Sequence, residues 1–169
     1  MLFLSAGHHP AAPGAAWKGF VEHQEAVKWV THLARLMPNA MMVPTGDLGR
    51  KVAWINARAK KGDLAVEIHF NAATPSAKGS ETLFAPGSIS GQAWAGEIQA
   101  CVSQFFFPNR GTKIGWYQAD PAKGPLAFLS KTKCTAVIVE PEFVYWADQI
   151  YANRAACCDA LARVLWRAV

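Results

Sequence analysis

Charged side chains are scarce in this sequence: Asp, Glu, Lys and Arg make up 17% of its 169 residues, whereas hydrophobic residues make up 51%. That balance excludes an intrinsically disordered chain. Long hydrophobic runs are also missing, and no apolar stretch reaches the roughly 20 residues that span a bilayer, so we expect no membrane insertion. The start carries no basic segment followed by a long apolar core, which predicts synthesis in the cytoplasm without a secretory signal peptide.

Cysteine is sparse, and no two cysteines have the spacing of a zinc-binding pair. The four are Cys101, Cys134, Cys157 and Cys158. The absence of a Cys-x-x-Cys pair excludes the common cysteine-based structural zinc sites. We expect reduced thiols that are mostly buried.

Clusters of basic residues are few as well, although the net charge is +5. The longest run is Lys60-Lys61, and no aromatic and basic signature of a nucleic-acid-binding module is present. We therefore expect no nucleic-acid partner. The positive charge by itself suits nucleic acid, an anionic membrane or an anionic cell wall, and it does not choose among them. No linker, repeat or low-complexity segment interrupts the chain, which predicts one domain over residues 1–169, acting as a monomer.

Apolar runs and helical periodicities alternate along the chain. Strands are predicted at 2–5, 40–43, 64–68, 81–84, 113–116 and 135–139. Helices are predicted at 19–37, 47–61, 88–107, 126–129 and 147–169, and loops at 11–16 and 118–125. This order predicts an α/β protein with a mostly parallel, twisted sheet and helices on both faces.

Titratable side chains stand where several predicted strands end. His8 and the adjacent His9 follow the first strand, His69 follows the strand at 64–68, and Glu140 ends the strand at 135–139. The carboxyl ends of parallel strands share one edge of a sheet. Glu22 lies in the first turns of the first helix near that edge, and Glu25 is an alternative one turn later.

Two imidazoles and a carboxylate are a known ligand set for catalytic zinc. A second carboxylate that does not bind the metal is what hydrolysis needs, because a base must take a proton from water. Each residue alone has an ordinary alternative, such as packing for a histidine or solvation of a strand end for an acid. Their meeting at one edge favours a metal centre, with His8 or His9 as one ligand.

Motifs in chain order strengthen this prediction. They are Gly7-His8, Gly19-Phe20-Val21-Glu22, Ile68-His69-Phe70-Asn71, Gly79-Ser80-Glu81-Thr82, Arg110-Gly111-Thr112-Lys113 and Val139-Glu140. Together they resemble the zinc-dependent N-acetylmuramoyl-L-alanine amidases of bacterial cell-wall hydrolases and phage endolysins, over nearly the whole chain. The chain departs from that family at Ser5-Ala6, where the family has Asp-Pro, and at Pro141, where it has glycine.

The resemblance implies a role for each matching residue. His8, Glu22 and His69 would bind Zn²⁺, and Glu140 would be the catalytic carboxylate. Substrate contacts are expected from Asn71, Arg110 and Trp116, with the exposed Trp116 packing on sugar rings.

The implied reaction is hydrolysis of the amide between N-acetylmuramic acid and L-Ala of peptidoglycan, by a phage endolysin that acts on the wall after release. The alternatives are a zinc peptidase that cuts within the stem peptide and a non-catalytic module that binds the cell wall.

Overall fold

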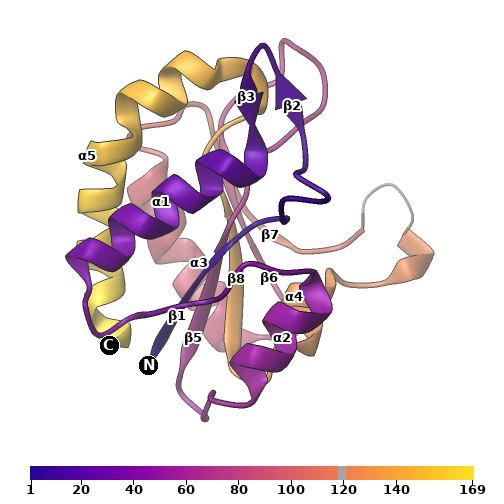
Figure 1. Ribbon diagram of the computed structural model, residues 1–169, viewed down its shortest axis with the longest axis vertical. Coiled ribbons are helices and arrows are strands. Elements are labelled where there is room, and N and C mark those ends of the chain that lie inside the picture. The colour runs from indigo at the N-terminus through magenta and orange to yellow at the C-terminus, as the bar shows by residue number, and fades with distance from the viewer. Residues whose placement is uncertain (118–120) are drawn as a thin grey trace.

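A central sheet organises the molecule in the computed structural model, which describes residues 1–117 and 121–169. In the described part of the chain this sheet has six strands, in the order β4-β1-β5-β8-β6-β7 (Figure 1). In chain order the strands are β1 (Leu2–Ala6), β4 (Met41–Met42), β5 (Leu64–Ile68), β6 (Ser80–Phe84), β7 (Asn109–Ile114) and β8 (Thr135–Glu140). All neighbours pair in parallel except β6 and β8, which are antiparallel. The predicted α/β class with a mostly parallel sheet is confirmed.

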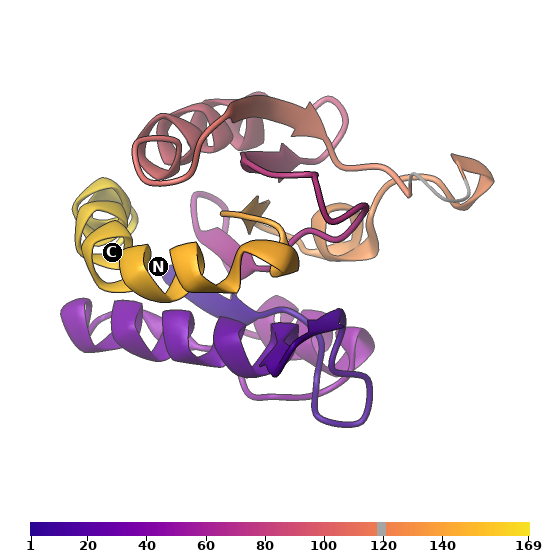
Figure 2. The ribbon, with the colours of Figure 1, turned by 90° about the horizontal axis from the view of Figure 1, so that it is seen from above.

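Helices cover both faces of the sheet. They are α1 (Glu22–Leu36), α2 (Leu48–Asn56), α3 (Ile89–Val102), α4 (Ala127–Lys131) and α5 (Ala147–Leu165), with 3₁₀ turns η1 (Pro121–Lys123), η2 (Val144–Trp146) and η3 (Trp166–Ala168). Figure 2 shows α1, α5 and α3 together along one side, whereas α2 and α4 lie on the other. None of the helices in this part of the chain combines the length and apolarity that crossing a bilayer requires.

The alternation of side chains along β1 and β5 divides the core between the two faces. Leu4 and Val66 belong to the apolar cluster beneath α1, α3 and α5. Phe3 and Ala65 belong to the second cluster, which α2 and α4 cover. The four cysteines are free and buried, as predicted. Polar residues at alternate positions of these strands therefore face α2 and α4, as Ser5 and Glu67 do.

The predicted start of the first helix is wrong by three residues. The helix begins at Glu22 rather than at residue 19, because Phe20–Val21 (β3) pairs antiparallel with Ala16–Trp17 (β2). These two short strands form a hairpin beside the end of β1 (Figure 1). A two-residue strand carries no periodicity, so the sequence predicts only a loop at residues 11–16, where β2 begins.

The region after α3 also differs from the prediction. The helix predicted to residue 107 ends at Val102, and the strand predicted at 113–116 spans Asn109–Ile114. This strand lies at the sheet edge and is polar and partly exposed, so it lacks the apolar run that marks a central strand. The loop predicted at 118–125 falls partly outside the described residues, and its residues 121–123 form η1.

Gly79, which precedes β6, offers a test of close backbone packing. Gly79 and Gly62 have similar positive φ angles, of 99° and 95°. A Cβ at Gly79 would lie 2.1 Å from the carbonyl oxygen of Pro108, whereas a Cβ at Gly62 would meet nothing within 4 Å. We expect Gly62→Ala to cost about 1–2 kcal/mol from backbone strain alone. Gly79→Ala should cost about 1–3 kcal/mol more, because the backbone must shift. Urea unfolding compares the two, and equal losses would contradict this packing.

Candidate metal centre

The first strand delivers His8 to the carboxyl edge of the sheet. β1 pairs with β5 from Leu2 opposite Leu64 to Ala6 opposite Ile68, and the N–H of Gly7 continues this ladder to the carbonyl of Ile68 at 2.8 Å. Gly7 lies against the ring of His69, since a Cβ there would come within 2.6 Å of that ring. A glycine is therefore required before His8, which itself has a φ of 59°.

Glu22 is the first residue of α1, and backbone groups hold the start of this helix. The N–H groups of Glu22 and His23 donate to the carbonyls of Ala15 and Pro13, both at 3.0 Å, so a capping side chain is replaced by the preceding loop. One carboxylate oxygen of Glu22 accepts from the N–H of Ala15 at 2.9 Å. The other accepts from the N–H of Phe70 at 3.1 Å. The buried carboxylate is thus fixed in orientation.

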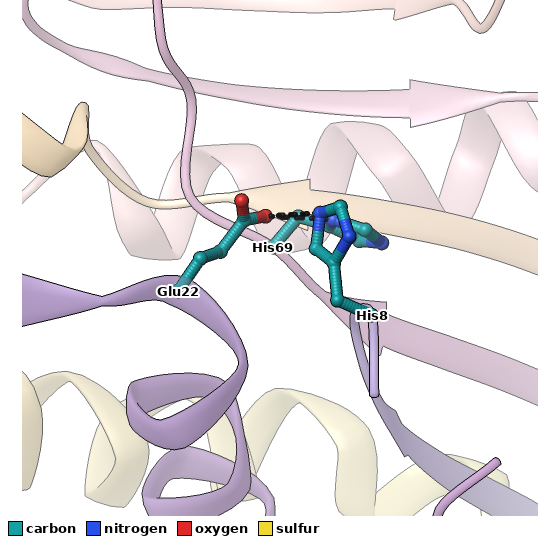
Figure 3. A group of neighbouring side chains, drawn as sticks. All are labelled: His8, Glu22 and His69. Carbon is teal, nitrogen blue, oxygen red and sulfur yellow. Dashed lines mark hydrogen bonds and ion pairs between the residues drawn. The ribbon is translucent and has the colours of Figure 1, made fainter. Parts of the chain in front are cut away.

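His8, Glu22 and His69 converge on one point (Figure 3). The Oε1 atom of Glu22 lies 3.0 Å from Nε2 of His8 and 2.9 Å from Nδ1 of His69. One donor atom from each residue lies within 4.8 Å of the other two. Two imidazoles and a carboxylate at this separation fit a zinc ion, which takes N and O ligands at about 2.0–2.2 Å.

The charges in this cluster are strongly coupled. Burial alone raises the pKa of Glu22, but hydrogen bonds from His69 and His8 outweigh that effect and lower its pKa to about 2. Burial likewise lowers the pKa of His69, but hydrogen bonds to Glu22 and Glu67 raise it to about 10. In the metal-free protein His69 is therefore a cation between carboxylates. A metal ion that binds here replaces that proton's positive charge.

Glu140 stands beside the cluster without a hydrogen-bond partner for one of its oxygens. It ends β8, next to β5, and its buried Oε2 atom has no partner among the described residues. Burial raises the pKa of Glu140 to about 8; the charge of His69 opposes this rise, and the charges of Glu22 and Glu81 add to it. A carboxyl group with this pKa can exchange a proton near neutral pH.

A pocket of about 420 Å³ opens beside these groups. Its polar wall contains His8, His69 and Glu140. Its apolar lining includes Leu48 of α2 and Leu126 and Phe128 at α4. A substrate bond placed in this pocket would lie beside His8, His69 and Glu140, whereas Glu22 is buried behind the two histidines that it contacts.

The structure separates the alternatives that the sequence left open. His9 lines the pocket, but it lies outside the three-residue cluster found in the described part of the chain. Glu25 pairs with Arg154 at 2.5 Å and with Lys28 at 3.1 Å, so its carboxylate faces α5 rather than the centre. The geometry thus favours His8 and Glu22, whose roles as ligands remain predictions.

The three predicted substrate contacts are not among the residues that line this pocket in the described part of the chain. Asn71 and Arg110 both bind the buried carboxylate of Glu81, at 2.6 and 3.0 Å. Trp116 is 40% exposed and forms a bridge with Pro125. Asn71 and Arg110 therefore organise the β6 end of the site, and no contact in the structure assigns the three to substrate.

Sequence reasoning missed Glu67 and Lys51. Both are buried, both line the pocket, and Glu67 contacts His69. The signal was present, since a carboxylate inside the apolar strand at 64–68 needs a buried partner. The identity of that partner, on a separate helix, depends on tertiary packing.

The first prediction from this geometry concerns the adjacent histidines. His8→Ala should weaken binding of a divalent metal by more than about 100-fold, which is the upper range for changes outside the ligand sphere. His9→Ala is the matched control and should keep metal affinity near that of the wild type. Metal content after dialysis against a weak chelator measures both. Greater loss in His9→Ala would reverse the assignment.

A second prediction concerns pH and the metal-free protein. The Glu140 carboxyl titrates near 8 when folded and near 4.5 when unfolded, so the folded state retains a proton that the unfolded state releases. Its contribution to stability is therefore present below pH 4.5 and is lost as the pH rises toward 8.

The Glu140→Gln substitution should remove this loss of stability at rising pH, because glutamine does not titrate. The wild type and the variant should diverge between about pH 5 and pH 6.5, below the range in which His69 titrates, with the variant more stable at the higher pH. Thermal unfolding with chelator present measures the difference. Parallel pH curves for the two proteins would show that Glu140 is not protonated in the folded state.

Known structures share this fold. Cwp6 from Clostridium difficile aligns with a TM-score of 0.86 and 19% identity over 99% of this chain, which spans 29% of Cwp6. The catalytic domain of the CD27L endolysin targeting Clostridia difficile aligns with a TM-score of 0.78 and 22% identity, covering 98% of this chain and 96% of that domain. The amidase AmiC2 of Nostoc punctiforme aligns with a TM-score of 0.79 and 19% identity, covering 99% of this chain and 96% of AmiC2.

At these identities the likeness establishes the fold, and no curated protein sequence matches this chain. The family assignment depends on a sequence profile that covers most of the chain. That profile, Amidase_3, matches residues 2–157, and the chain therefore belongs to the N-acetylmuramoyl-L-alanine amidase family.

Proposed function

We propose that this protein hydrolyses the amide between N-acetylmuramic acid and the L-Ala of the peptidoglycan stem peptide, with zinc held by His8, Glu22 and His69. The observation that carries the proposal is the convergence of these three side chains beside the pocket that Glu140 also lines. The family membership supports the choice of bond. The net charge of +5 favours approach to an anionic wall.

The protein groups have distinct tasks in this mechanism. Zinc supplies a lowered pKa for bound water and polarisation of the scissile carbonyl. Glu140 accepts the proton of the attacking water and then donates it to the departing amine. Its raised pKa suits both steps, because a carboxyl group that titrates near neutral pH can act as base and acid in turn. Glu22 stays ionised and is held by backbone N–H groups, which keeps the ligand set rigid.

The proposal extends to the biological setting. One solved structure with this fold is the catalytic domain of an endolysin, which supports a role as a phage endolysin acting on peptidoglycan after release. We further propose that residues 1–169 act as one catalytic domain and as a monomer, without a nucleic-acid partner.

Digestion of purified peptidoglycan, with released fragments read by mass spectrometry, tests the reaction. We expect free stem peptides that begin at L-Ala, their loss with a chelator, and their return when zinc is added. Fragments cut within the stem peptide would establish a zinc peptidase instead. Binding to the wall without cleavage, with zinc present, would establish a non-catalytic module.

Glu140→Gln separates chemistry from metal binding in the same assay. The side-chain amide of glutamine cannot accept the proton of the attacking water, so the rate of peptide release should fall by about 10²–10⁴-fold, the range associated with general acid–base catalysis. Zinc content should stay at the wild-type level, because Glu140 is not in the cluster. Wild-type activity in this variant would remove Glu140 from the mechanism.

A further inference from the structure

The ring of His69 is held at both of its nitrogen atoms. Nδ1 lies 2.9 Å from Oε1 of Glu22, inside the candidate metal centre. Nε2, on the opposite side of the ring, lies 3.0 Å from Oε1 of Glu67. The ring therefore has one nitrogen directed at the centre and one directed at a carboxylate outside it.

Glu67 is itself buried and constrained. It lies in β5, two residues before His69, and is 3% exposed. Its second oxygen, Oε2, accepts from the hydroxyl of Ser5 at 2.7 Å and from the ammonium of Lys51 at 3.2 Å. Ser5 lies opposite Glu67 in the register of β1 and β5, and Lys51 extends from α2. Side chains from β1 and α2 thus converge on this carboxylate of β5.

Stability alone does not account for this arrangement. A buried ion pair is often no more stable than apolar residues of similar volume, because both charges lose their hydration. Lys51 is also buried, with 4% of its side chain exposed, and it donates a second hydrogen bond to the carbonyl of Ala6. Because such pairs are often replaceable by apolar residues without loss of stability, the buried Glu67–Lys51 pair calls for an explanation beyond the stability of the fold.

We propose that Glu67, held by Lys51 and Ser5, is a positioning residue that fixes the orientation and tautomer of His69. When the Nε2–H of His69 donates to Glu67, the lone pair of Nδ1 is left for a metal ion. Carboxylates that orient metal-binding histidines in this way raise the basicity of the ligand and limit rotation of its ring. The inference rests on the proposed function, because it requires His69 to bind zinc.

Paired apolar substitution tests this role without leaving a charge buried alone. Glu67→Leu/Lys51→Met removes both charges of the pair and should still fold in the metal-free state, with a modest loss of stability from the missing hydrogen bond to His69. Its zinc affinity, measured by competition with a chromogenic chelator, should fall about 10- to 100-fold. Glu67→Gln/Lys51→Met restores an acceptor oxygen and should recover part of that affinity.

Glu25 and Arg154 provide a matched control. They form another buried carboxylate pair, at 2.5 Å, between α1 and α5. Glu25→Leu/Arg154→Met removes the same kinds of charge without touching His69, and its zinc affinity should equal that of the wild type. A similar loss in both double variants would show a general effect of charge burial and would overturn the inference.

The tautomer of His69 supplies a readout independent of activity. In ¹⁵N-resolved NMR of imidazole rings, His69 of the zinc-loaded wild type should carry its proton on Nε2. The Glu67→Leu/Lys51→Met variant should show a mixture of forms or a broadened signal.

The outcomes also separate this inference from the proposed function. Wild-type zinc affinity in both Glu67 double variants, with the His69 tautomer unchanged, would overturn the positioning role alone. A wild-type protein that binds no zinc would overturn both proposals. Should Glu67→Leu/Lys51→Met fail to fold, the volume-conserving Glu67→Gln/Lys51→Met decides by the same two measurements.

Discussion

Parallel pairing of β5 with β1 on one side and with β8 on the other is the constraint on which the candidate centre depends. The register places Ala6 opposite Ile68, and Ile68 opposite Val139. The ends of these three strands therefore lie at one edge of the sheet, where His8, His69 and Glu140 line the same pocket. A slip of one residue would turn each strand's side chains to the opposite face and disperse the group.

Close approach of backbone to side chain completes the geometry. Glycines at positions 7 and 14 leave room for the ring of His69 and for Glu22 with His8, since a Cβ at either position would come within 2.6 Å of those side chains. The hairpin of β2 and β3 holds the loop that anchors Glu22. Two other carboxylates at this edge form ion pairs: Glu67 pairs with Lys51, and Glu81 pairs with Arg110 and Lys113. Glu140 is left with one oxygen unpaired among the described residues, and burial, together with the neighbouring carboxylates, raises its pKa.

The sequence was sufficient to predict the sheet and the meeting of His69 with a second histidine, at position 8 or 9, and an acid of the first helix. The central strands are apolar runs, which makes β5 and β8 recognisable in the sequence. Because the carboxyl ends of parallel strands lie at one edge of a sheet, the residues at those ends are predicted to be neighbours. The elements missed were those without such a signal. β7 is a polar edge strand, and β2 and β3 are too short to show a period. Asn71 and Arg110 matched motifs in the sequence, yet their observed partner is Glu81.

The sequence by itself determined the order of the elements and the residue types at the strand ends, because periodicity and apolar content are local properties. Only the tertiary structure placed His8 and Glu22, rather than His9 and Glu25, in the cluster with His69, since membership depends on which atoms reach a common point. It also decided that Glu67 lies against both His69 and Lys51. Those contacts join β5 to α2, and a contact between separate elements has no local pattern in the chain.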